Sequence, residues 1–312
     1  MLRAAFAYRL NGIRLSVAKQ LIVTADDFGV AVPVNEAVEF GHRNGILTGA
    51  SLMVTAPAAA DAVERARRLP TLGVGLHVVL VDGRPALPPE QIPDLVQPNG
   101  RFFDDVIRIA LPLYASRKVQ AQAEAEVRAQ LGLFRHTGLT LDRVDGHHHL
   151  HLHPTLQRIL LRLAPEFGID AMRLPREPFT VSWAATHERA AARLMSWLLL
   201  RGRTATMRRR IARAGLRCND TILGLNDSGH MTPRRVRQFV SALPEGTSEL
   251  YMHPATRRWG SVDPLPDSYE PEQEYAALID PGVREALRAS GAVLTTFAAL
   301  GTPRMRPQDL PT

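Results

Sequence analysis

Short apolar runs rich in β-branched residues alternate along the chain with segments whose apolar residues recur at helical spacing. The first strand-like run, 20–24, is followed by segment 33–44, in which Val34 and Val38 fall on one helical face and Gly45 marks the end. The same criteria predict further strands at 48–55, 73–81, 141–145, 171–174, 221–225, 249–252 and 293–297, and further helices at 57–69, 104–136, 155–167, 232–243 and 281–290.

This alternation predicts an α/β protein built on a parallel sheet. The chain has 312 residues, enough for two domains of ~150 residues or for one barrel of ~250. We expect a flexible N-terminal extension over 1–19, a single barrel domain over 20–305 and a tail over 306–312. Within the barrel, segment 82–103 is rich in Pro and Gly and is predicted to be a loop that faces the substrate.

Polar residues interrupt the apolar pattern at the carboxyl ends of the predicted strands. In a barrel of parallel strands these ends open on one face, and that face carries the active site. Five strand ends share this habit, which favours a barrel over two separate domains. The polar residues are Asp26 and Asp27, His77, the histidine-rich segment 147–153, Arg173 and His253.

Asp26 and Asp27 follow the first strand directly. Neighbouring residues of a regular strand point to opposite sides, so both can face one ligand only if the backbone turns there. One carboxylate can then bind a metal while the other reaches an attacking water. The alternative is a helix cap or a turn before Pro33, where Asp is common.

Five of the eleven histidines lie between residues 147 and 153. Positions 147, 149, 151 and 153 share a face if the segment is extended, and 147 and 151 do so if it is helical. Imidazole is the commonest neutral metal ligand, although a single buried histidine such as His77 is more often structural. Together, Asp27, His77 and His147 would form a three-ligand site with an open position for water, as in catalytic zinc sites.

Three further residues complete a hydrolytic site in this hypothesis. Asp26 would take a proton from the water, and His253 would donate a proton to the leaving group. Arg173 would keep Asp26 ionised, because a nearby positive charge lowers the pKa of a carboxylate.

Composition narrows the cellular setting. A single cysteine, Cys218, excludes an intrachain disulfide and a cysteine-based zinc site, which favours a reducing, cytoplasmic compartment. The longest apolar run, 194–200, is interrupted by Ser196 and is too short to span a membrane.

The net charge of +7 is concentrated in two segments, the first 19 residues and 181–217. The second segment holds nine arginines against one acid, Glu188, with apolar residues interleaved. A basic helix with aromatic anchors can lie on an anionic membrane, whereas an ordinary barrel helix with a solvated basic face is the alternative. Nucleic acid is not an expected partner, because no recognition motif accompanies the charge. The predicted membrane contacts are Trp183, Trp197, Arg201 and Arg203.

Five sequence motifs contain the polar residues at the strand ends: Thr-Ala-Asp-Asp-Phe-Gly at 24–29, Gly-Leu-His at 75–77, Asp-Gly-His-His-His-Leu-His at 145–151, Arg-Leu-Pro-Arg at 173–176 and Met-His-Pro at 252–254. They resemble the motifs of the YdjC-like carbohydrate deacetylases, in the family's order, and the resemblance runs from about residue 20 to about residue 300. Segments 46–48, 51–54, 57–62 and 75–85 are similar to a subgroup of this family that is associated with hopanoid biosynthesis, HpnK.

The resemblance implies a distorted, TIM-like (β/α) barrel and a divalent metal ion held by Asp27, His77 and His147, with Asp26 as the base. Zinc suits these ligands best, and magnesium, manganese and cobalt stay open. The implied reaction removes the N-acetyl group from an N-acetylglucosamine-type sugar. For the subgroup, that sugar is carried by a hopanoid glycolipid, and the enzyme would lie in the cytoplasm, peripherally at the inner membrane.

Several alternatives stay open on sequence grounds. The substrate would be a soluble chito-oligosaccharide if the subgroup resemblance does not extend to the lipid. A phosphoesterase on the same barrel would favour two metals, the second held by His149, His151 and His153. A glycosidase is disfavoured because the metal occupies the carboxylate pair. A non-catalytic membrane-associated binding protein is disfavoured by the retention of all five motifs. The sequence indicates neither the oligomeric state nor the substrate-binding residues.

Overall fold

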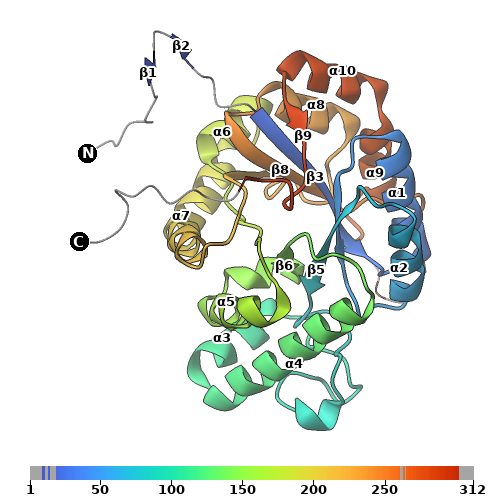
Figure 1. Cartoon of the computed structure of the whole chain (residues 1–312), viewed down its shortest axis with the longest axis vertical. Helices are drawn as coiled ribbons and strands as arrows, with labels where there is room; N and C mark the ends of the chain where they lie inside the picture. Colours follow the sequence, from blue (N-terminus) through green and yellow to red (C-terminus); the bar gives the residue numbers. More distant parts are fainter. Residues whose placement is uncertain (1–8, 11–12, 15–18, 261–262, 264, 302–312) are drawn as a thin grey trace.

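The computed structural model describes residues 9–10, 13–14, 19–260, 263 and 265–301. A curved parallel β-sheet forms the centre of the molecule, and helices pack around it (Figure 1). The order along the sheet is β6-β5-β4-β3-β8-β7, and β9 pairs with the start of β3. The strands are β3 (Lys19–Phe28), β4 (Gly49–Leu52), β5 (Gly73–Val78), β6 (Val144–Gly146), β7 (Thr221–Leu223), β8 (Gly246–Met252) and β9 (Val293–Leu294).

Strand β3 is the centre of this sheet. It pairs with β8 from Lys19–Gly246 to Ala25–Met252 and with β4 on its other side. All of its residues from Leu21 onwards are buried, as expected for a parallel strand that is covered on both faces. Its carboxyl end therefore carries Asp26 and Asp27 into the interior of the molecule.

The sheet closes only partly into a barrel. Beyond β6, isolated parallel bridges join Val144 to Met172 and Ala171 to Arg217, and the ladder between β7 and β8 follows. The predicted strand at 171–174 is thus reduced to these bridges. The prediction of one α/β domain with a distorted barrel of parallel strands is confirmed.

The structure describes only a few residues of the predicted N-terminal extension and none of the predicted tail. In the N-terminal segment, β1 (Arg9–Leu10) pairs antiparallel with β2 (Ile13–Arg14). The rest of the extension up to residue 18, and the tail over 306–312, lie outside the described residues. The boundaries of the extension and the tail stay predictions.

The prediction that segment 104–136 is mostly helical is confirmed, and the structure divides it into two helices, α3 (Val106–Ala115) and α4 (Arg117–His136). Ser116 separates them, and its hydroxyl accepts a hydrogen bond from the backbone N–H of Val119 at 3.3 Å. Such a cap satisfies a backbone donor that the first turn of a helix leaves free.

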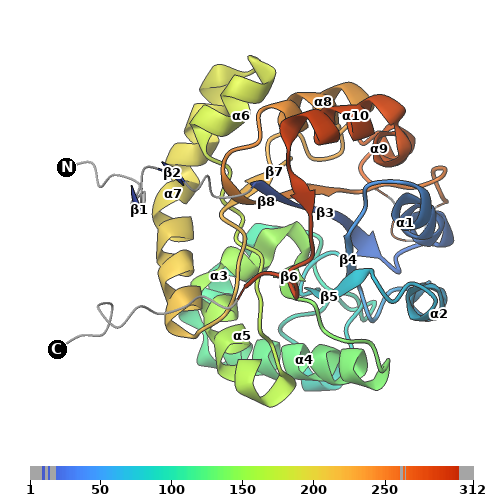
Figure 2. The same ribbon diagram turned by 45° about the horizontal axis from the view of Figure 1, so that its top comes forward.

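The long loop and the basic segment differ in secondary structure. Segment 82–103 contains the short helix η1 (Pro89–Gln91) and an isolated antiparallel bridge between Val96 and Phe102. Glu126 of α4 accepts hydrogen bonds from the backbone N–H groups of Ala86 and Leu87 at 2.7 and 2.9 Å. The basic segment forms most of α6 (Phe179–Thr186) and all of α7 (Ala190–Arg213), which runs along one side of the barrel (Figure 2). The remaining helices are α1 (Val32–Asn44), α2 (Ala59–Arg67), η2 (His147–Leu152), α5 (Pro154–Phe167), α8 (Pro233–Ser241), α9 (Pro271–Ile279) and α10 (Pro281–Ser290).

Candidate metal and catalytic site

A pocket of about 270 Å³ lies at the carboxyl ends of the strands. Its polar floor is formed by five of the six predicted site residues. Aromatic and hydroxyl-bearing side chains, among them Tyr251, Trp259 and Tyr269, line its walls. The floor residues are Asp26, Asp27, His77, His147 and His253.

The three predicted metal ligands come together at the floor of the pocket. Ligand atoms of Asp27, His77 and His147 all lie within 4.8 Å of one another. Oδ1 of Asp27 lies 3.4 Å from Nε2 of His77 and 3.1 Å from Nδ1 of His147. That oxygen is buried and has no hydrogen-bond partner. An acceptor left without a donor between two imidazoles fits a cation held by all three groups.

The backbone explains how both aspartates can face the pocket. Asp27 has a φ of 60°, in the left-handed region, and the register between β3 and β4 shifts between Ala25 and Phe28. This irregularity breaks the alternation of side chains at the end of β3. The predicted turn at the end of the strand therefore exists, and the interpretation of the two aspartates as only a helix cap does not hold.

Asp145, at the end of β6, orients His77. Its Oδ1 lies 2.7 Å from Nδ1 of His77, which leaves Nε2 of the imidazole facing Asp27. Although burial lowers the pKa of His77, the charges of Asp145 and Asp26 raise it to about 10. A carboxylate behind a histidine is the arrangement that fixes the orientation of metal-binding imidazoles.

Arg173 holds Asp26 with two parallel hydrogen bonds. Its two terminal nitrogens donate to Oδ2 and Oδ1 of Asp26 at 2.6 and 2.7 Å, and Ser51 donates to Oδ1 at 3.0 Å. Burial raises the pKa of Asp26, but the charge of Arg173 and its hydrogen bonds outweigh burial and bring the pKa to about 2. The expectation that Arg173 keeps Asp26 ionised agrees with this geometry.

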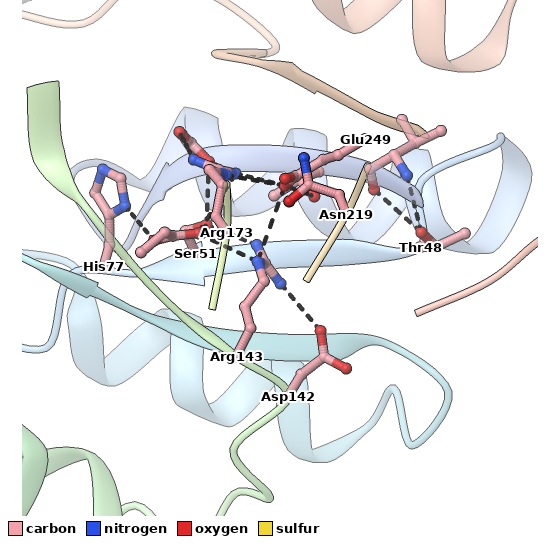
Figure 3. A network of polar contacts seen from close by, with 12 residues as sticks. Thr48, Ser51, His77, Asp142, Arg143, Arg173, Asn219 and Glu249 are labelled. Atoms are coloured by element: carbon pink, nitrogen blue, oxygen red, sulfur yellow. Dashed lines mark hydrogen bonds and ion pairs between the residues drawn. The ribbon is translucent and has the colours of Figure 1, made fainter. Parts of the chain in front are cut away.

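Arg173 and Arg143 belong to a buried polar network beneath the pocket (Figure 3). Arg173 also donates to Glu249 at 2.8 and 3.0 Å. Arg143 donates to Asp145 at 3.2 Å and to Ser51 at 2.6 Å. Because every charge here has a partner of opposite sign, the network can exist in the interior and hold the residues above it in place.

His253 follows β8 and lies at the edge of the same floor. Its backbone N–H donates to Glu274 of α9, and its ring centroid lies 5.2 Å from that of Tyr269. Burial lowers the pKa of His253, against the opposing charges of Asp27 and Asp26. The lowered pKa favours the neutral imidazole, whereas the sequence hypothesis needs His253 to donate a proton.

Comparison with known proteins agrees with this geometry. A family model described as YdjC-like protein matches residues 20–289. The chain belongs to the YdjC-like family. A carbohydrate deacetylase of Mus musculus is 33% identical over 307 residues, which cover 91% of this chain and 96% of that protein. A carbohydrate deacetylase of Brevibacillus brevis is 41% identical over 152 residues, but these span only 57% of that protein and 48% of this chain.

A solved structure from Enterococcus faecalis shares the fold of this YdjC-like protein. The two have a TM-score of 0.66 at 23% sequence identity, over 90% of this chain and 98% of the other. At that identity the similarity establishes the fold alone.

The histidine cluster of this YdjC-like chain adopts neither of the two predicted conformations. It forms the 3-10 helix η2, in which His148 and His149 have φ values of 52° and 53°. Only His147 joins the ligand group with Asp27. His153 instead caps α5, since its Nδ1 accepts from the backbone N–H of Thr155 at 3.2 Å. Among the described residues, His149, His151 and His153 do not form a second ligand group.

Among the residues beneath the pocket, sequence reasoning assigned a role to Arg173 but none to Arg143, Asp145 and Ser51. Arg143 and Asp145 are two positions apart in the predicted strand 141–145, so the alternation of side chains puts them on one face. Charged residues are almost never buried unless they are paired. This spacing was the available signal. Ser51 carried no comparable signal, because an isolated serine in an apolar strand predicts nothing specific.

The predicted membrane contacts lie away from the pocket floor, on α6 and α7. Trp183 is 40% exposed. The guanidinium of Arg201 lies 5.3 Å from the ring centroid of Trp197, and that of Arg203 lies 5.8 Å from the ring of Tyr114 on α3. No helix among the described residues is long and apolar enough to cross a membrane.

Proposed function

We propose that this protein is a metal-dependent hydrolase that removes the N-acetyl group from an N-acetylglucosamine-type sugar. The observation that carries the proposal is the meeting of Asp27, His77 and His147 beside the Asp26–Arg173 pair in one pocket. The relatives named carbohydrate deacetylase support the reaction class.

The donor set fits one divalent ion, and two imidazoles with one carboxylate favour zinc over magnesium, manganese or cobalt. When bound, such an ion would polarise the acetyl carbonyl and lower the pKa of a coordinated water. Asp145 would keep Nε2 of His77 aimed at the ion, since it engages the opposite nitrogen.

Asp26 would accept the proton of the attacking water. A carboxylate with a pKa near 2 is a weak base, so this step needs a water that is already acidified. The same paired hydrogen bonds from Arg173 that make Asp26 a weak base also fix the position of both Asp26 oxygens. Orientation of the base is then the main contribution of Arg173.

His253 would protonate the departing amine. Because the lowered pKa favours its neutral form, His253 would have to gain a proton within the reaction cycle before it donates one. Nδ1 of His253 is buried and has no hydrogen-bond partner, so a ring nitrogen is free to carry that proton.

The substrate we propose is an N-acetylglucosaminyl hopanoid glycolipid, with the protein bound peripherally at a membrane surface. Two exposed apolar stripes support contact with lipid. One lies on α3, where Ile107 and Leu111 are 66% and 64% exposed, and the other lies on α7, where Leu199 is 73% exposed. Arg203 and Tyr114 bring the two helices into contact, and the arginines of α7 add the charge that an anionic surface attracts.

Acetate release tests the reaction. The purified protein should release acetate from an N-acetylglucosaminyl lipid, lose this activity to a chelator and regain it with zinc. Asp26→Asn should keep the metal but lower turnover by roughly 10²–10⁴-fold. Near-normal turnover of Asp26→Asn would exclude Asp26 as the base, and equal turnover of a soluble chito-oligosaccharide would remove the lipid from the proposal.

A further inference from the structure

A second group of potential metal ligands lies at the mouth of the same pocket. Ligand atoms of Asp82, His147 and His148 all lie within 4.8 Å of one another. Oδ2 of Asp82 lies 3.6 Å from Nε2 of His148, and both side chains are more than two-fifths exposed. His147 is the one residue that this outer group shares with the inner group of Asp27 and His77.

The backbone holds these side chains at unusual positions. Asp82 has a φ of 47° and His148 a φ of 52°, in the left-handed region that non-glycine residues seldom occupy. Seven described non-glycine residues have positive φ, and five of them line this pocket. Such conformations cost about 1–3 kcal/mol each and cluster at ligand sites, where the surrounding structure maintains them.

Contacts with neighbouring residues hold the segments that carry Asp82 and His148 in place. Asp82 follows the buried residues Val79–Val81, and its backbone N–H donates to the carbonyl of Phe103 at 2.8 Å. His148 lies between His147, at the floor, and His149, whose ring packs 5.0 Å from that of Tyr251. The carboxylate and the imidazole therefore face each other across the mouth from two anchored segments.

We propose that Asp82 and His148 form an outer cation site, which takes a divalent ion of the zinc class more weakly than the inner site does. One nitrogen of His147 cannot serve both ions at once. When the inner site is filled, the outer ion keeps Asp82 and His148 and completes its coordination with water. An ion at the mouth narrows the path into the pocket, so excess metal should inhibit the enzyme. The ligands define this site, and its existence does not depend on the deacetylase reaction.

A matched pair elsewhere in the chain serves as the control. His230 and Glu270 are also exposed, and Nδ1 of His230 lies 3.4 Å from Oε2 of Glu270. That pair belongs to no group of three ligands among the described residues. It therefore reproduces the charge and exposure of Asp82 and His148 at a place outside the pocket lining.

Calorimetric titration of zinc into protein already loaded with one equivalent tests the proposal. Wild type and His230→Ala should show a second, weaker binding event. Asp82→Asn and His148→Ala should each weaken that event by at least about tenfold, since loss of one supporting group costs 10–100-fold in metal affinity. Circular dichroism checks that each variant is folded.

A second experiment measures the expected inhibition of acetate release by excess zinc. Excess zinc should slow acetate release by wild type and His230→Ala, and Asp82→Asn should be less sensitive, measured as the ratio of rates with and without the excess. The absence of a second event in wild type, or its persistence in both Asp82→Asn and His148→Ala, would overturn the proposal. Loss of the event in His230→Ala would also overturn it, because surface charge alone would then explain the binding. The titration needs no substrate, so it stands even if no acetate is released.

Discussion

Arginines serve two regions of this molecule in opposite ways. Beneath the pocket, Arg143 and Arg173 are completely buried, and their guanidinium groups contact carboxylates at hydrogen-bond distance. On α7, Arg201 and Arg203 are exposed, and the contacts that the structure assigns to their guanidinium groups are with aromatic rings. Burial decides the difference, because a buried cation must be paired whereas an exposed one is solvated. Residue type alone therefore says little about what an arginine contributes.

Arg173→Met should have the largest effect and tests the buried region. It would leave Asp26 and Glu249 charged, buried and without their main partner, which costs about 3–5 kcal/mol of the free energy of unfolding. Acetate release should fall to background, because Asp26 loses its orientation. Urea denaturation measures the stability, with Arg201→Met as the matched control expected within about 0.5 kcal/mol of wild type. Equal losses of unfolding free energy in Arg173→Met and Arg201→Met would contradict the distinction between buried and exposed arginines.

The protonation of a buried carboxyl group likewise depends on whether a cation lies beside it. Asp26 has a cation beside it, whereas Glu177 is buried with one oxygen unpaired, and its Oε2 accepts from the backbone and side chain of Asn226 at 2.9 and 2.6 Å. Burial raises the pKa of Glu177 to about 7, against the opposing hydrogen bonds from Asn226. Glu177 is therefore protonated in the folded protein at pH values where the unfolded chain has lost that proton.

Glu177→Gln should remove one pH-dependent contribution to stability. Between pH 4.5, the ordinary value, and pH 7 the folded state binds more protons than the unfolded state, so stability falls as pH rises and levels off above the folded pKa. As pH rises across this window, the free energy of unfolding of Glu177→Gln should increase by about 1–3 kcal/mol relative to that of wild type. Denaturation of the metal-free proteins at pH 5, 6, 7 and 8 measures the difference. A constant difference between Glu177→Gln and wild type across these pH values would refute the assignment.

The sequence predicted the fold class and the pocket floor because both depend on short-range pattern. Polar residues at strand ends must meet when the strands are parallel, so Asp27, His77 and His147 could be placed together without coordinates. The separation of His153 from the metal ligands could not be predicted from the pattern of strand ends. It depends on the backbone of η2, in which His148 and His149 adopt left-handed conformations.

Arg193 marks the limit of composition as a guide. It belongs to the basic segment 181–217, yet its guanidinium is buried and makes paired hydrogen bonds to Asp227 at 2.7 and 2.8 Å. Composition predicts one environment for the whole segment, a membrane contact or a solvated face, whereas its arginines divide between the interior and the surface. The partner acid lies 34 residues further along the chain, so only the tertiary structure reveals the pair.

The smallest effect is expected on α7, where Arg201→Gln and Arg203→Gln should each leave the free energy of unfolding within about 0.5 kcal/mol of wild type. Co-sedimentation with anionic phospholipid vesicles should nevertheless weaken about fivefold for each substitution, since one basic residue near such a surface contributes about 1 kcal/mol. The difference should shrink as salt is added, because salt screens the attraction. Arg43→Gln is the control, since its helix α1 lies across the barrel from α7 in both views (Figures 1 and 2). Equal loss of binding for Arg43→Gln would show that net charge, and not the α7 surface, draws the protein to lipid.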